Sequence, residues 1–382
     1  MRIDVDFLLE ETAAELGLDD YGDPSFRDGL EALTDAGPAA MLTPLGEAVF
    51  NATIRQALAN RLRVTNWHAT QLQVPAHESD VGIIIVGLPR TGTTVLSHLL
   101  GIDPANRSLR SWEANESVPP PTTATYWTDP RYQRAMTTPR ALDQLNPSFR
   151  AIHHDSPEEP VECAVALAQH FASVSYSTMF NIASYDRWLV SADLSRAYQY
   201  HRQVLGVLDS QCPGPWQLKS PAHGYGMEAV AAIYPKALFV QPHRDPVRSI
   251  ASACSLTAAL SGTFTDHDFR PYIAEHWPEL MATILDRVVD YRDRHGDDRF
   301  IDLAYHEIVN DPIACVRRIY GRLGRELAPN VETVMQEHLA TATPHRYGRH
   351  DYSLAEFGLS REPLENRLAG YLDRFDVPRE QV

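Results

Sequence analysis

The chain has 382 residues, a formal net charge of −16 at pH 7 and 44% hydrophobic residues, a composition typical of a folded enzyme with a substantial core. The acidic balance disfavours a nucleic-acid-binding surface, and no apolar run approaches the roughly 20 residues needed to cross a bilayer. The amino terminus lacks the basic flank of a signal peptide, so we expect cytoplasmic residence. The 4 cysteines are far apart and show no metal-ligand spacing, which predicts neither disulfides nor a bound metal.

Helical periodicity of apolar residues marks the first part of the chain. Two stripes of large apolar side chains recur there at helical spacing: Val5, Leu8, Leu9 and Leu16 in the first, and Ile54, Leu58, Leu62 and Trp67 in the second. We therefore expect a helical cap over residues 1–78.

Beyond residue 80 the pattern changes to short apolar segments that alternate with helical ones. The predicted strands lie near 82–87, 216–219, 237–241 and 299–304. This alternation predicts a parallel sheet. We expect one domain, with an α/β core over residues 80–330, a helical insertion at about 115–212 and a closing segment over residues 331–382.

The segment from Val81 to Leu100 carries the most information. An apolar β run breaks at Gly87, and a helix begins just beyond Gly92, which is the spacing of a Walker A phosphate-binding loop. Where an NTPase has Lys after the second Gly, this chain has Thr93, and the strong cation of the loop is Arg90. The segment predicts an anion-binding loop that is not built for ATP hydrolysis, on a P-loop-like three-layer fold with a central parallel sheet.

The segment Pro89 to Thr94 resembles the phosphosulfate-binding loop of sulfotransferases that use 3′-phosphoadenosine-5′-phosphosulfate (PAPS). The loop form and the arginine-rich, lysine-poor composition look most similar to the bacterial, actinobacterial-type members of that family. The resemblance implies PAPS as co-substrate, bound without a metal. It also implies contacts to PAPS from Pro89, Arg90, Thr91, Gly92, Thr93 and Thr94, with a catalytic contribution from Arg90.

A second group of candidates follows two later strands. Arg244 comes at the end of the 237–241 strand, where an open α/β sheet binds its ligands. In the family the matching Arg, together with a Ser eight residues later, holds the 3′-phosphate, so the resemblance assigns Arg244 and Ser252 to it. Lys219 ends the 216–219 strand, and it is one of only two lysines in the chain, with Lys236. We expect Lys219 to act in catalysis through its charge.

Two residues compete for the role of general base. Several Golgi-type sulfotransferases use a Glu at the end of the second strand, and Glu113 lies in a matching place. Cytosolic members use the His of a Lys-x-His motif, but here the interval from Lys219 to His223 is two residues longer. We prefer Glu113, with His223 as the alternative. His153 and His154 form a third, weaker possibility.

Two further elements resemble nucleotide contacts of the family. Tyr305 follows the 299–304 strand, where the family's Tyr reaches the adenine, although His306 shifts the register by one residue. Near the carboxyl end, Arg346, Gly348 and Arg349 resemble the late basic segment that closes over PAPS. A core tyrosine without a functional role would explain Tyr305 equally well, and an ordinary loop would explain Arg346, Gly348 and Arg349 equally well.

The resulting expectation is a PAPS-dependent sulfotransferase acting on a hydroxyl of a small molecule, a lipid or a glycolipid, with no nucleic-acid partner and no transmembrane segment. The oligomeric state is left open by the sequence. One alternative is a P-loop kinase or NTPase, which Thr93 and Arg244 disfavour. Another is a catalytically silent nucleotide-binding protein on the same fold, against which Arg90, Lys219 and Arg244 argue.

Overall fold

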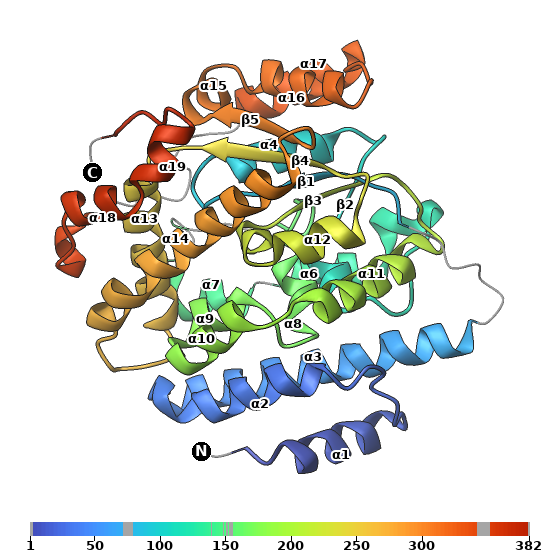
Figure 1. The fold of residues 1–382 in the computed structure, drawn as a ribbon. Helices are drawn as coiled ribbons and strands as arrows, with labels where there is room; N and C mark the ends of the chain where they lie inside the picture. The colour runs from blue at the N-terminus through green and yellow to red at the C-terminus, as the bar shows by residue number, and fades with distance from the viewer. Residues whose placement is uncertain are drawn as a thin grey trace.

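The computed structural model describes residues 3–71, 79–138, 140–147, 149, 152, 156–341 and 352–380, and within them the centre of the molecule is a parallel sheet (Figure 1). The sheet has five strands in the order β2-β3-β1-β4-β5. Their bounds are β1 (Val81–Ile85), β2 (Arg107–Ser108), β3 (Trp216–Lys219), β4 (Leu238–His243) and β5 (Phe300–Ala304). The expected α/β fold is confirmed, and β2 is an additional edge strand.

Three helices precede the sheet, namely α1 (Val5–Leu16), α2 (Phe26–Ala36) and α3 (Pro44–Thr70). Each of α1 and α3 begins at a capping side chain, since Asp4 accepts from the amide of Phe7 and Thr43 accepts from the amide of Gly46.

The remaining α-helices of the described residues run from the phosphate-loop region to the carboxyl end. They are α4 (Thr93–Ile102), α5 (Ser111–Asn115), α6 (Pro130–Thr137), α7 (Ala141–Leu145), α8 (Ala164–Ala168), α9 (Val174–Phe180), α10 (Ala183–Ser191), α11 (Ser195–Asp209), α12 (Met227–Ile233), α13 (Pro246–Ser261), α14 (Arg270–His295), α15 (Tyr305–Asn310), α16 (Pro312–Arg322), α17 (Pro329–Thr341), α18 (Arg361–Arg367) and α19 (Ala369–Arg374). Short 3₁₀ helices include η2 (Thr123–Thr128) and η4 (Pro221–Gly226). No helix of this described part is long and apolar enough to span a membrane.

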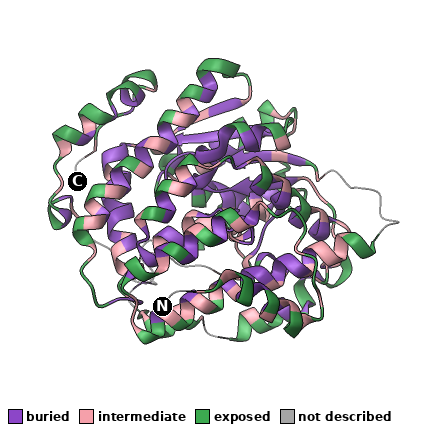
Figure 2. Cartoon of the chain, turned by 60° about the horizontal axis from the view of Figure 1, so that its bottom comes forward, coloured by how far each residue is buried: buried purple, intermediate pink, exposed green. Residues whose placement is uncertain are grey.

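The two faces of the sheet are covered by different helices, which gives three layers (Figure 1). Ile83, Ile85 and Val240 pack in one apolar cluster with residues of α4, α16 and α17. Val81 and Phe239 belong to the other cluster, with residues of α12 and α14. Because both faces are buried, the central strand β1 consists of apolar residues and glycine, as is usual for parallel sheets; Figure 2 shows the strands buried at the centre of the molecule.

The amino-terminal helices pack on other helices rather than on the sheet. Helix α2 lies against α10, and α3 lies against α5 and α11; Figure 1 shows them on the side of the insertion helices. The predicted stripes of α1 and α3 are largely buried, with Leu8, Leu9, Ile54, Leu58 and Leu62 inside. These helices therefore support the insertion, which in turn lies between them and the sheet.

The strand order sets the position of the site. Strand β1 lies between β3 and β4, with Ile85 aligned with Lys219 on one side and with Val240 on the other. The chain reaches β4 from β3 by passing β1, which makes a topological switch point. Ligands of open α/β sheets bind at the carboxyl ends of the strands at such a point.

Candidate active site

The loop between β1 and α4 is shaped by backbone conformations that favour glycine. Gly87 and Gly92 have φ values of 102° and 96°. A Cβ on Gly87 would lie 3.2 Å from the carbonyl oxygen of Pro242, and one on Gly92 would lie 3.1 Å from Ile308. Both conformation and space therefore select glycine at these two positions.

Helix α4 begins directly after this loop, and its N-cap, Gly92, offers no side-chain hydrogen bond. The first-turn N–H groups of a helix lack partners within the helix, and with the helix dipole they attract anions. The hydroxyl of Thr91 donates to the carbonyl of Leu88 at 2.7 Å and closes the loop on itself. This geometry is compatible with the predicted anion-binding role of the segment from Pro89 to Thr94.

Arg90 lies inside the loop with its side chain exposed and a φ of 69°. Such a left-handed conformation is uncommon for residues with a side chain and is typical of functional loops. Its main-chain carbonyl accepts a hydrogen bond of 2.8 Å from Nη1 of Arg244. The sheet therefore brings the predicted cations of β1 and β4 together at one edge.

Lys219 ends β3 at the same edge and is almost fully buried. Its Nζ donates to Oε1 of Glu162 at 2.9 Å, and the two side chains are 5% and 32% exposed. The amide of Cys163 donates to the carbonyl of Lys219 at 3.0 Å. The insertion therefore passes along the carboxyl edge of the sheet and places a partly exposed carboxylate beside the predicted catalytic lysine.

Glu162 is a candidate that the sequence analysis did not identify. The contact with Lys219 joins residues 57 positions apart, so no local pattern or spacing marks it. Its neighbours in the chain carry no recognised motif. Only the folded arrangement of the insertion over the sheet reveals it.

Glu113 lies two strands away from β1, just after the edge strand β2, and its side chain is 0% exposed. Its Oε2 accepts from Arg107 at 2.9 Å, while Oε1 accepts from the hydroxyl of Tyr126 at 3.0 Å and from the amide of Arg110 at 3.2 Å. These contacts hold the start of α5 against β2. The carboxylate is therefore engaged in a buried structural network, and its role as base stays a prediction.

His223 lies in η4 and is also fully buried. Its Nδ1 is 2.8 Å from the hydroxyl of Tyr198, and its Nε2 is buried with no partner among the described residues. Burial lowers the pKa of His223 to about 3, with a smaller contribution from His201. The imidazole is therefore neutral near pH 7, and its low basicity makes it a weak proton acceptor.

Arg244 follows β4 and has a closely defined environment. Its guanidinium lies 3.9 Å from the ring centroid of Tyr305, and its Nε and Nη2 each donate to the carboxylate of Glu380 at 2.8 Å. A hollow of about 270 Å³ is lined by these three residues among others. The structure therefore brings Tyr305 beside Arg244, and the contact of either residue with a nucleotide stays a prediction.

The turn after Arg244 leads directly into α13. Asp245 is the N-cap of α13, accepting from the amide of Val247 at 2.9 Å, and Pro246 occupies the first turn. Ser252 is buried in the second turn of this helix, so it shares the helix that Arg244 precedes. Its contact with a phosphate stays a prediction.

The remaining sequence candidates cannot be placed. Arg346, Gly348 and Arg349 lie outside the described residues, as do His153 and His154. The described carboxyl-terminal segment reaches the edge of the sheet at Glu380, which contacts Arg244 and Asp245. Glu380 was not among the expected site residues.

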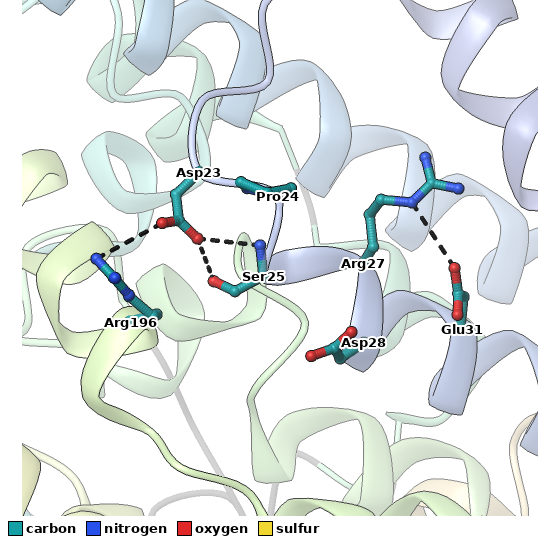
Figure 3. Close-up of a pocket in the computed structure, with 7 residues that line it drawn as sticks. All are labelled: Asp23, Pro24, Ser25, Arg27, Asp28, Glu31 and Arg196. Carbon is teal, nitrogen blue, oxygen red and sulfur yellow. Dashed lines mark hydrogen bonds and ion pairs between the residues drawn. The ribbon is translucent and has the colours of Figure 1, made fainter.

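A separate hollow of about 470 Å³ lies between the start of α2 and α11 (Figure 3). Four of its charged side chains form two ion pairs, Arg196 with Asp23 at 3.6 Å and Arg27 with Glu31 at 3.7 Å. Helix α2 is on the side of the molecule away from the sheet (Figure 1). We therefore place the candidate active site at the edge of the sheet and not in this hollow.

Comparisons with known proteins identify the family of the chain. A family model described as "Sulfotransferase family" matches residues 82–329. The crystal structure of sulfotransferase STF9 from Mycobacterium avium is 32% identical, with a TM-score of 0.87 over 99% of this chain and 98% of that one. Sulfotransferase STF1 from Mycobacterium tuberculosis H37Rv is 31% identical, with a TM-score of 0.81 over 97% and 99%. The chain therefore belongs to the sulfotransferase family, an enzyme class, and the expected resemblance is confirmed.

Curated relatives are more distant. Omega-hydroxy-beta-dihydromenaquinone-9 sulfotransferase Stf3 from Mycobacterium bovis and from Mycobacterium tuberculosis is 26% identical over 262 residues. That match spans 64% of this chain and 63% of the relatives, which is less than two thirds of their length. Family membership favours a sulfotransferase over the P-loop kinase that the sequence left open.

Proposed function

We propose that this protein transfers the sulfuryl group of PAPS to a hydroxyl of a small lipid-like molecule. The observation that carries the proposal is the meeting of three elements at the carboxyl edge of adjacent strands. These are the anion-binding loop with Arg90 after β1, the Lys219–Glu162 pair at β3, and Arg244 beside Tyr305 after β4.

The residues present fit PAPS, which has an anionic group at each end. The loop amides, the start of α4 and Arg90 suit the 5′-phosphosulfate. Arg244, whose planar fork of donors matches phosphate oxygens, suits the 3′-phosphate, with Ser252 as a further ligand. Tyr305 offers a ring next to Arg244 for the nucleoside. The hydrogen bond between Arg244 and the carbonyl of Arg90 couples the two anion sites.

Catalysis follows from charge and position. In an in-line transfer the acceptor oxygen bonds to sulfur, the bond from sulfur to the bridging oxygen breaks, and negative charge develops on the departing phosphate. Arg90, Lys219 and the loop amides are positioned at the edge where that charge is stabilised. The products are a sulfate ester and adenosine 3′,5′-bisphosphate.

Glu162 is the general base that the geometry favours. It is 32% exposed next to Lys219, so an acceptor hydroxyl can approach it and give up its proton. Glu113 has no exposed surface and its oxygens are already occupied by Arg107, Tyr126 and a main-chain amide. His223 is buried and weakly basic. We therefore propose Glu162 as base, with Glu113 and His223 as the alternatives.

The proposed acceptor class rests on the relatives. Stf3 is named for a hydroxylated dihydromenaquinone, an isoprenoid lipid. Glu162 and Cys163 of the insertion contact Lys219 at the edge of the sheet, so we propose that the insertion helps to form the acceptor pocket.

The test is transfer of ³⁵S from labelled PAPS to a panel of lipid alcohols that includes an ω-hydroxylated isoprenoid quinone, a glycolipid and a sterol. Labelled product with at least one alcohol supports the proposal. The reaction with [γ-³²P]ATP and magnesium serves as the control for kinase activity. Binding of adenosine 3′,5′-bisphosphate without transfer to any acceptor in the panel would favour the catalytically silent alternative.

A further inference from the structure

The carboxylate of Glu380 lies on the guanidinium that the proposed function assigns to the 3′-phosphate. Oε1 accepts from Nε of Arg244 and Oε2 from Nη2, both at 2.8 Å. Two parallel hydrogen bonds of this kind are also the way in which arginine binds a phosphate. The position of the carboxylate is thus the position that a phosphate would take.

The main chain around Glu380 is fixed by contacts that do not involve its side chain. Its amide donates to Oδ2 of Asp245 at 2.8 Å, and its carbonyl accepts from Arg361. Arg361 also pairs with Oδ2 of Asp245 at 3.0 Å. Asp245 in turn caps α13. The carboxyl-terminal segment is therefore held at the start of α13, and the side chain of Glu380 is the part that can leave Arg244.

The donors of Arg244 are already shared between two partners. Nη1 bonds to the carbonyl of Arg90, and the fork formed by Nε and Nη2 bonds to Glu380. The two side chains are 11% and 31% exposed, and both line the hollow of about 270 Å³ that Tyr305 also lines. A phosphate that approaches Arg244 from this hollow therefore finds the Nε and Nη2 donors already bonded to Glu380.

We infer that Glu380 is a built-in competitor for the 3′-phosphate and sets the affinity of the enzyme for PAPS and for its nucleotide product. Binding exchanges one anion for another on Arg244, and the displaced carboxylate stays nearby and repels the phosphate. Glu380 therefore weakens retention of the nucleotide and favours product release. This inference rests on the proposed function, because it takes Arg244 as the 3′-phosphate ligand.

Calorimetric binding of two nucleotides tests the inference. Adenosine 3′,5′-bisphosphate carries the 3′-phosphate, and adenosine 5′-monophosphate lacks it. Glu380→Gln should tighten the bisphosphate about tenfold, the amount by which a charge-assisted contact commonly differs from a neutral one. It should leave the monophosphate affinity unchanged. Glu380→Ala keeps the main-chain contacts but removes the competing side chain altogether, so it should tighten the bisphosphate at least as much as Glu380→Gln does.

Two matched variants complete the design. Glu362→Gln removes an exposed carboxylate from the same carboxyl-terminal part and should change neither affinity. In an Arg244→Ala background, Glu380→Gln should give no gain for the bisphosphate. If the wild-type protein prefers the bisphosphate and both Glu380 variants bind it equally well or more weakly, the inference is wrong and the proposed function stands. If the wild-type protein does not distinguish the two nucleotides, the 3′-phosphate site fails, and the proposed donor fails with it.

Discussion

Nη1 of Arg244 donates a 2.8 Å hydrogen bond to the main-chain carbonyl of Arg90. The bond joins the residue after β4 to the middle of the loop after β1, where Arg90 has a φ of 69°. A non-glycine residue in this conformation needs support from its surroundings. Arg244 therefore has two roles, as a proposed phosphate ligand and as a brace for the anion-binding loop.

Replacement of Arg244 should weaken nucleotide binding more than replacement of an exposed arginine elsewhere on the surface does. We expect adenosine 3′,5′-bisphosphate to raise the melting temperature of the wild-type protein more than ATP with magnesium does at equal concentration, because tighter binding to the native state stabilises it more. Arg244→Ala should remove most of this difference, as should Arg244→Lys, which keeps the charge but not the fork. Arg317→Ala, at an exposed ion pair with Glu332, is the control and should leave it intact. Equal stabilisation of the wild-type protein by ATP would contradict the assignment.

The loop should remain inactive toward ATP even when the Walker lysine is restored. Thr93 is buried in the first turn of α4, and the end of β4 carries Arg244 where an NTPase would need a metal-binding carboxylate. We expect Thr93→Lys to release no phosphate from ATP with magnesium above the wild-type background in a coupled assay. Thr94→Lys, at the exposed neighbouring position, is the matched control. ATP hydrolysis at rates typical of NTPases in the first variant alone would show that the loop is an NTPase loop.

The parts of the fold that were predicted correctly depend on local sequence. The strands at β1, β3, β4 and β5 are short apolar runs, and the start of α13 is signalled by the adjacent Asp245 and Pro246. The glycines at 87 and 92 mark the loop because their positive φ values already favour glycine on local grounds. Parallel pairing then brings the strand ends together, so Arg90, Lys219 and Arg244 were expected at one edge.

The contacts that were not predicted join residues far apart in the chain. Glu380 is 136 positions from Arg244, and Glu162 is 57 positions from Lys219. No spacing rule connects such residues, because a loop or an insertion of any shape can lie between them. Glu113 is the opposite case, a residue that the sequence favours as a base and that the fold surrounds with structural partners. Its place after β2 is compatible with a catalytic base, but the buried partners Arg107 and Tyr126 that occupy its carboxylate appear only in the folded chain.

Burial of His223 predicts a stability effect at acidic pH. Its pKa is lowered to about 3 in the folded state, against about 6.5 in the unfolded chain. Between these two pH values the imidazole of His223 is protonated in the unfolded chain but not in the folded protein. The contribution of His223 to the free energy of unfolding is therefore fully present above about pH 6.5 and is lost as the pH falls toward 3. The loss amounts to about 2 kcal/mol between pH 6.5 and 5.

His223→Asn removes this titration, so its stability relative to the wild-type protein should improve by about that amount between pH 7 and pH 5. Urea denaturation at the two pH values measures the difference. His338→Asn, at a half-buried histidine of α17, is the control and should show no such change. A wild-type pH–rate profile with a limb near 6.5 that disappears in His223→Asn would instead show that this residue titrates during catalysis and would restore it as the base.

The choice between Glu162 and Glu113 can be made with one isosteric change at each position. Glu162→Gln keeps the shape beside Lys219 but cannot accept the acceptor's proton, so we expect a loss of about 10² to 10⁴ in turnover with nearly unchanged bisphosphate affinity. Glu113→Gln breaks a buried ion pair and leaves Arg107 with the longer, 4.0 Å contact to Asp209, so its main effect should be a loss of about 3 kcal/mol in the free energy of unfolding. Turnover per folded molecule in Glu113→Gln should remain within about tenfold of the wild-type value, because its carboxylate is fully buried and held by structural partners. Steady-state kinetics with labelled PAPS, corrected for the folded fraction, separates the two effects. If Glu113→Gln folds normally and is inactive while Glu162→Gln keeps its turnover, the base is Glu113, and the carboxylate beside Lys219 serves only to hold the lysine in place.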